Sequence, residues 1–196
     1  HDNTVFPLEK QRLESVQKRR MGLGVTGLAN AIEALGFPYG SPKFLEVAED
    51  IFKVIRDETY RASVALAKEK GAFPAFDADE YLKGKFIKTL PKTVRAGIRK
   101  HGIRNSHLLS FAPTGTISLT ADNVSGGVEP VFSYGYDRTI QTENGPIVEE
   151  VMDYAYRTWG VRGKKANDCT AEEHLNVLAL AQKYVDSAVS KTINCS

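Results

Sequence analysis

Cysteine is scarce in this sequence, which holds only Cys169 and Cys195. The two lie far apart and no second pair accompanies them, so neither a disulfide framework nor a zinc knuckle is indicated. The four histidines have no regular spacing with one another or with a carboxylate, so we predict no metal site. Reduced thiols are the expected state of both cysteines.

Long apolar runs and a net charge of one sign are also missing. No stretch approaches the roughly 20 apolar residues of a membrane span, and the N-terminal residues do not resemble a signal peptide. We therefore expect a cytoplasmic protein with no membrane partner. The 26 basic and 24 acidic side chains give a net charge of +2 and look mixed along the chain, which argues against a nucleic-acid polymer as partner. A small anionic ligand needs only a local site and stays compatible with this balance.

The size of the chain favours one hydrophobic core. With 196 residues and 42% hydrophobic content, the sequence predicts a single domain, or part of one, over residues 1–196. It begins at His1 without a methionine and stops just after "SKTIN", which reads as a strand. We expect a fragment, a processed product or one chain of a split protein.

The spacing of apolar residues predicts more helices than strands. The predicted helices span 7–21, 28–35, 42–70, 91–100, 147–158 and 171–188, with a helical turn at 78–82. The last of these helices opens with a capping box of Thr170 and Glu173. The predicted strands span 22–27, 107–112, 131–141 and 189–194. Apolar strands that alternate with helices favour an α/β fold with a mostly parallel sheet or barrel.

The segment "SFAPTGTIS" combines the end of a buried strand with small hydroxyl residues. If the strand delivers the chain to a helix N-terminus, the free N–H groups and the helix dipole there bind a phosphate without any lysine. Gly115 would let the ligand approach the backbone, and Thr114, Thr116 and Ser118 would add hydroxyl donors. Simple helix capping explains the same residues equally well, so both interpretations stay open. The segment is not a P-loop, because no Gly-Lys-Ser/Thr triplet occurs.

A second glycine motif, "GLGVTG" at 22–27, formally matches the dinucleotide-binding pattern. The basic run "QKRRM" precedes it where an apolar strand is needed, so a packing role for its glycines is favoured. Glu129 in "SGGVEP" is interpreted as an acid that holds its loop by accepting backbone N–H groups, with a buried site acid as the alternative. Cys169 directly precedes the capping box, where the helix N-terminus can make a thiol more reactive. A single cysteine without a partner is more often unreactive, and we expect this of Cys169.

Several segments together resemble one family. The segments "RRMGLGVTGLANAIEALG", "KEKGAFP", "APTGTIS", "SGGVEPVF" and "SKTIN" are similar, in this order, to the large catalytic subunit of ribonucleotide reductase. The similarity is greatest to the adenosylcobalamin-dependent class and covers nearly the whole chain. It implies a helix-rich part, roughly the C-terminal half, of a ten-stranded α/β barrel.

The resemblance also implies a site and its partners. In that family the loop matching Pro113, Thr114, Gly115, Thr116, Ile117 and Ser118 binds the phosphates of the substrate nucleotide. The implied ligands and partners are a ribonucleoside di- or triphosphate, adenosylcobalamin, the remaining part of the catalytic subunit and a dithiol reductant such as thioredoxin. This favours phosphate binding over simple capping.

The sequence departs from the family at the catalytic cysteines. The family's radical cysteine lies in an Asn-Pro-Cys-Gly-Glu type segment, which is absent here, and neither Cys169 nor Cys195 matches a catalytic position. We therefore assign no catalytic residue and expect this chain alone to be inactive. Two other functions stay open: a non-catalytic nucleotide-binding or assembly module, and a nicotinamide-dependent oxidoreductase built on "GLGVTG".

Overall fold

The computed structural model describes residues 3–193, which group into two units. Unit 1 comprises His1–Leu23, Phe52–Ser110 and Tyr184–Ala188, and unit 2 comprises Gly24–Ile51, Phe111–Lys183 and Val189–Ser196. Each unit therefore draws on segments that are far apart in the sequence. The expectation of one partial domain stays a prediction.

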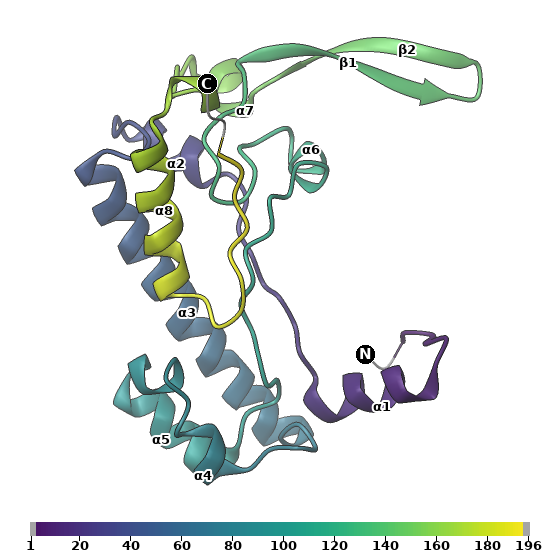
Figure 1. Ribbon diagram of the computed structural model, residues 1–196, viewed down its shortest axis with the longest axis vertical. Helices are drawn as coiled ribbons and strands as arrows, with labels where there is room; N and C mark the ends of the chain where they lie inside the picture. The colour runs from purple at the N-terminus through teal and green to yellow at the C-terminus, as the bar shows by residue number, and fades with distance from the viewer. Residues whose placement is uncertain (1–2, 194–196) are drawn as a thin grey trace. The chain divides into compact units, whose positions relative to one another are not determined.

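Unit 1 is helical. It contains α1 (Glu9–Lys18), α4 (Ala78–Tyr81), η1 (Ile87–Thr89), α5 (Lys92–His101) and the part of α3 (Pro42–Lys70) that begins at Phe52. α4 and α5 lie beside the C-terminal half of α3 (Figure 1). Gly97 of α5 leaves so little room that an added Cβ would lie 3.2 Å from Val64 of α3, and Tyr60 of α3 is fully buried. The predicted helices 7–21, 42–70 and 91–100 and the turn at 78–82 are confirmed within a few residues.

Charge is less evenly mixed in unit 1 than expected from the whole sequence. Residues 81–121 contain eight lysines and arginines and no aspartate or glutamate. Several of these cations, including Lys85, Lys88 and Lys92, are exposed. The balanced total of the chain therefore hides a basic stretch that covers η1 and α5.

The apolar segment 107–111 is extended, and its apolar side chains are buried. Leu108, Leu109 and Phe111 are at most 2% exposed, as predicted for a strand covered on both faces. The backbone pairs only through isolated parallel bridges, Leu23 with Leu109 and Phe111 with Val189. The expected burial is confirmed for these three residues, whereas Ala112 is exposed and no continuous strand forms over residues 107–112.

Unit 2 carries the remaining elements. They are α2 (Leu28–Ala34), the first part of α3, α6 (Ile117–Thr120), β1 (Gly135–Thr142), β2 (Gly145–Met152), α7 (Tyr154–Trp159), η2 (Ala166–Asp168) and α8 (Ala171–Lys183). The predicted capping box is confirmed, because Thr170 Oγ1 accepts from Glu173 N and Glu173 Oε2 accepts from Thr170 N. α8 ends at Lys183, five residues before the predicted end. The predicted strand 189–194 shows only its bridge at Val189, and Asn194 lies outside the described residues.

The helix predicted over 147–158 is wrong in its first half. Residues 145–152 form β2, which pairs antiparallel with β1 from Gly135 opposite Met152 to Thr142 opposite Gly145, and the resulting hairpin is extended (Figure 1). Asn144-Gly145 is a strong hairpin turn signal, and the β-branched Ile147 and Val148 fit a strand. The spacing of these apolar residues also fits a helix, and this explains the wrong prediction for the first half of 147–158. The helix α7 starts only after Asp153, whose carboxylate caps Tyr156 N.

The longest helix, α3, has 29 residues. Neither it nor any other helix within residues 3–193 is both long enough and apolar enough to cross a membrane.

Candidate functional site

The segment Pro113 to Ser118, here called the hydroxyl loop, follows directly on the buried segment 107–111. Thr114 has a φ of 53°, a left-handed conformation that turns the chain sharply. α6 begins at Ile117, and Ser118 N donates to Thr114 O at 2.7 Å. The predicted tight turn and short helix are confirmed, whereas the buried strand predicted before them shows only isolated bridges.

Three adjacent backbone N–H groups of the hydroxyl loop are free. Within the described part of the chain, the N–H groups of Gly115, Thr116 and Ile117 have no hydrogen-bond acceptor. Gly115, Thr116 and Ile117 are exposed, so these N–H groups are open to water or to a ligand. The loop therefore presents a row of donors that suits an anion.

A second glycine turn, Ser125 to Pro130, packs against the hydroxyl loop. A Cβ on Gly126 would overlap the carbonyl oxygen of Pro113, and a Cβ on Gly127 would overlap that of Ala112. Gly127 N also donates to Thr114 Oγ1 at 2.7 Å. The glycines are required because the two backbones approach too closely for any side chain.

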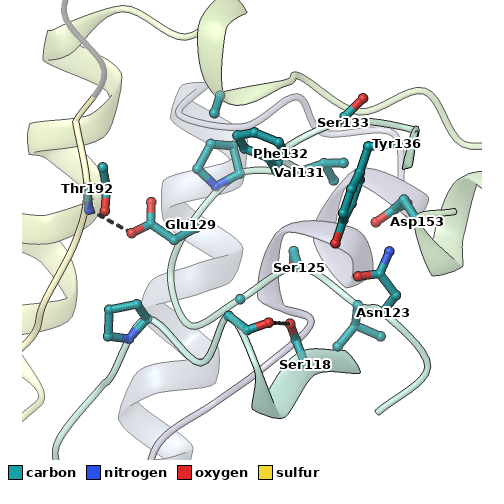
Figure 2. A pocket seen from close by; sticks show the side chains of 16 residues that line it. Ser118, Asn123, Ser125, Glu129, Val131, Phe132, Ser133, Tyr136, Asp153 and Thr192 are labelled. Atoms are coloured by element: carbon teal, nitrogen blue, oxygen red, sulfur yellow. Dashed lines mark hydrogen bonds between the residues drawn. The ribbon is translucent and has the colours of Figure 1, made fainter. Parts of the chain in front are cut away.

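The two segments border a cavity of about 430 Å³, shown in Figure 2. Of the six predicted phosphate-binding residues, Pro113, Gly115 and Ser118 line it. Thr114, Thr116 and Ile117 do not line it, although they belong to the same loop. Other polar residues of the wall are Asn123, Ser125, Glu129, Ser133, Tyr136, Asp153 and Thr192. A cavity of this volume is within the range of small-molecule sites.

A buried asparagine joins the second glycine turn to the start of α7. The Asn30 carboxamide donates to Asp153 Oδ1 and Oδ2 at 3.1 and 2.9 Å, and its oxygen accepts from Ser125 N. All three residues are at most 5% exposed. The Asp153 carboxylate on the cavity wall is therefore already hydrogen-bonded, which fixes it and limits its repulsion of an anion.

Glu129 is bound on both carboxylate oxygens. Oε2 pairs with Lys191 Nζ at 2.7 Å, and Oε1 accepts from Thr192 N at 2.7 Å. The Lys191 side chain is fully buried and its ammonium lies 5.3 Å from the centre of the Tyr39 ring. Burial lowers the pKa of Lys191, while the hydrogen bond and charge of Glu129 oppose that shift. Glu129 does hold a loop by accepting a backbone N–H group, as predicted, but the loop it holds is 191–192 and its second partner is a buried lysine.

The other candidate residues are structural. An added Cβ on Gly22 would lie 3.0 Å from the Ser110 Cβ, so this glycine serves close packing. Gly27 has a φ of 75° and serves a turn, with Val124 3.5 Å from an added Cβ. The Cys169 thiol contacts Lys165 O at 3.4 Å, and burial raises its pKa to about 11. That cysteine is therefore protonated at neutral pH, and the helix N-terminus does not activate it.

Two polar residues escaped the sequence analysis although they organise the site. Asn30 sits on the buried face of α2 among Leu28, Ala29 and Ile32, and a polar residue within an apolar helix face was the available signal. Asp153 follows the hairpin as the N-cap of α7. Their pairing joins segments distant in sequence, and no local pattern predicts it.

Comparison with known proteins identifies the family. The family model described as "Ribonucleotide reductase, barrel domain" matches residues 1–196. A vitamin B12-dependent ribonucleoside-diphosphate reductase of Thermoplasma acidophilum is 34% identical over 220 residues, covering 98% of this chain and 27% of that protein. The enzyme of the same name from Mycobacterium tuberculosis is 32% identical over 203 residues, covering 90% of this chain and 27% of its own.

A relative whose name does not mention vitamin B12 matches as well. Ribonucleoside-diphosphate reductase 1 subunit alpha of Escherichia coli is 26% identical over 211 residues, covering 96% of this chain and 26% of that protein. The chain thus spans about a quarter of the length of the curated relatives it matches. Because the family model covers the whole sequence, the chain belongs to the ribonucleotide reductase barrel domain family.

Proposed function

We propose that this chain is part of a ribonucleotide reductase catalytic subunit and binds the phosphate groups of the substrate during radical-based reduction to a deoxyribonucleotide. The observation that carries the proposal is the row of unpaired N–H groups at Gly115, Thr116 and Ile117 beside the cavity. The names of the relatives favour a ribonucleoside diphosphate over a triphosphate as substrate.

Each residue of the hydroxyl loop has a distinct proposed role. Pro113 fixes the entry to the turn, and Thr114 positions the loop through its bond to Gly127. Gly115 leaves space for the ligand, since a Cβ there would meet no protein atom within 4 Å. Thr116 and Ile117 supply N–H donors, and Thr116 adds an exposed hydroxyl. The Ser118 hydroxyl donates to Gly115 O at 3.2 Å and so closes the turn.

The electrostatics of the cavity are compatible with an anion despite its two carboxylates. Glu129 is neutralised by Lys191, and Asp153 is hydrogen-bonded by Asn30 and by Tyr156 N. A phosphate at the edge of the cavity formed by Gly115 would lie next to the N–H donors of the hydroxyl loop, and the two carboxylates of the wall already have partners. Charge-assisted bonds from such donors contribute about 1.5 to 3 kcal/mol each.

The radical chemistry is proposed to come from outside the described residues. Adenosylcobalamin, when bound to the complete subunit, supplies the radical in the class that this chain resembles, and relatives named as vitamin B12-dependent support that source. The cavity of about 430 Å³ suits a nucleotide and is too small for a corrin, so the residues around it do not fit this cofactor. The remaining part of the subunit, which carries the catalytic cysteines, and a dithiol such as thioredoxin complete the proposed system.

Replacing Gly115 by valine in the complete subunit tests this function. A β-branched side chain there should obstruct the approach of the ligand to the backbone, so affinity for a ribonucleoside diphosphate should fall at least tenfold while the fold survives, as measured by calorimetric titration. Gly27→Ala is the control. Gly27 has a φ of 75°, so an alanine there should lower the stability of the protein more than its affinity for the nucleotide. Unchanged binding in a folded Gly115→Val protein would refute the phosphate assignment.

A further inference from the structure

The segment 189–192 is attached to both ends of the phosphate site. Before the hydroxyl loop, Phe111 bridges Val189 in parallel, and Ser190 N donates to Phe111 O at 2.9 Å. Beyond the second glycine turn, Glu129 holds Lys191 and Thr192. Thr192 also lines the cavity, where Figure 2 shows its bond to Glu129.

The ion pair between Glu129 and Lys191 is the buried link in this attachment. The Lys191 side chain is 0% exposed and that of Glu129 is 18% exposed. Tyr39 lies against the Lys191 ammonium, and its own hydroxyl donates to Val128 O at 2.6 Å. Lysine, tyrosine ring and the backbone next to Glu129 therefore form one packed group.

Glu129 is connected to the hydroxyl loop through the second glycine turn. Glu129 N donates to Gly126 O at 2.8 Å, which closes the second glycine turn. Gly126 and Gly127 in turn press against the Pro113 and Ala112 carbonyls, and Gly127 N is bonded to Thr114. A chain of hydrogen bonds and close contacts therefore runs from Lys191 to Thr114.

We propose that Lys191 is a positioning residue of the substrate site: its buried pair with Glu129 holds the second glycine turn against the hydroxyl loop and so sets the arrangement of the phosphate-binding N–H groups. The proposal rests on the proposed function of the hydroxyl loop. It assigns to a residue nearly 80 positions downstream a role in the affinity for the substrate's phosphates, without contact between Lys191 and substrate.

The test compares three variants of the complete subunit. Lys191→Met removes the ammonium and keeps an unbranched stem of similar length. The double variant Glu129→Gln with Lys191→Met leaves no unpaired buried charge, so it retains more thermal stability than the single variant. Lys164→Met is the matched control, because Lys164 pairs with Glu173 in the same unit and neither residue lines the cavity.

Equilibrium binding of a ribonucleoside diphosphate and of the matching monophosphate is measured by calorimetric titration. Lys191→Met and the double variant should bind the diphosphate at least fivefold more weakly. The ratio of diphosphate affinity to monophosphate affinity should fall by at least threefold. Lys164→Met should stay within twofold of the parent. A merely structural pair would affect melting temperature and leave the ratio between the two ligands unchanged.

The outcomes separate this proposal from the proposed function. If Gly115→Val weakens binding while a folded double variant binds both ligands as the parent does, Lys191 has no positioning role and the phosphate assignment stands. If Gly115→Val has no effect, the phosphate assignment itself fails. If the single variant does not fold, the double variant alone decides, and loss of folding in both shows that the pair acts on the fold and overturns the proposal.

Discussion

The hydroxyl oxygen of Thr114 accepts a hydrogen bond from the backbone N–H of Gly127 at 2.7 Å. This bond fastens the hydroxyl loop to the second glycine turn and gives the buried Gly127 N–H its partner. A threonine with a φ of 53° is uncommon, because a β-branched side chain crowds the backbone in that conformation. The strain is tolerated here where a side-chain oxygen has a specific partner.

Replacing Thr114 by valine preserves the shape of the side chain and removes that oxygen. We expect the free energy of unfolding to fall by about 1 to 3 kcal/mol, since a buried N–H loses its acceptor. Nucleotide affinity should fall as well, because the loop is no longer held. Thr114→Ser is the control: it keeps the hydroxyl and should restore most of both properties in thermal unfolding and binding measurements.

Gly126 and Gly115 should respond very differently to the same substitution by alanine. A Cβ at Gly126 overlaps the carbonyl oxygen of Pro113, and backbone cannot move aside as a flexible side chain can. We expect Gly126→Ala to destabilise by about 1 to 3 kcal/mol, as overpacking typically does. At Gly115 a Cβ meets nothing within 4 Å, so Gly115→Ala should leave the melting temperature nearly unchanged. Equal melting temperatures for the two variants would contradict the close approach of the backbones.

His174 should make stability depend on pH. The side chain is 1% exposed, and its burial, with Lys191 nearby, lowers its pKa below the usual 6.5. As the pH falls below about 6.5, His174 is therefore protonated in the unfolded chain before it is protonated in the folded chain. The stabilisation by neutral His174 is complete above about pH 6.5 and is lost as the pH falls through the folded pKa, at up to about 1.4 kcal/mol per pH unit.

The variant His174→Phe tests this pH dependence, since phenylalanine packs against Tyr39 and does not titrate. Between pH 7.5 and pH 5.5, the melting temperature of the parent should drop more steeply than that of the variant. Above pH 8 the difference between them should be constant. Parallel curves throughout the range would show that His174 does not titrate in unfolding.

The 196-residue chain alone should not reduce ribonucleotides. Cys169 is held as a protonated thiol with a pKa of about 11, and the sequence contains no Asn-Pro-Cys-Gly-Glu type segment. Incubation with adenosylcobalamin, a dithiol and a ribonucleoside diphosphate should give no deoxyribonucleotide by chromatography. Turnover by the purified chain would show that the chemistry is assigned to the wrong residues.

The features predicted correctly are those with a local cause. The start of α6 follows from Pro113 and the small residues after it, and the start of α8 follows from the Thr170 and Glu173 box. The end of β1 follows from Asn144-Gly145. Each signal acts within a few residues, so the sequence alone is enough to find it.

The features missed depend on contacts between distant segments. No rule of sequence spacing predicts the two buried pairs, Asn30 with Asp153 and Glu129 with Lys191. The error over 147–152 has the same origin, since apolar residues there fit a helix until β1 is available as a partner. The turn and helix start of the hydroxyl loop were predicted because their signal is local, and its phosphate-binding role stays a prediction. The residues that hold the loop in place were not predicted.

The parallel bridges described above have a consequence for how the chain acquires its structure. The backbone around Leu109 has partners from both directions in the sequence. Leu23, which is bonded to Leu108 O and Ser110 N, lies far before it, and Ser187, whose N–H donates to Leu109 O, lies far after it. Helices α3 and α5 need only nearby residues and can form early during synthesis, but these bridges require the closure of very long loops. The backbone of Leu108 to Phe111 therefore cannot complete its pairing until residues 186–190 have left the ribosome. Before then, this apolar segment is exposed and can associate with other chains.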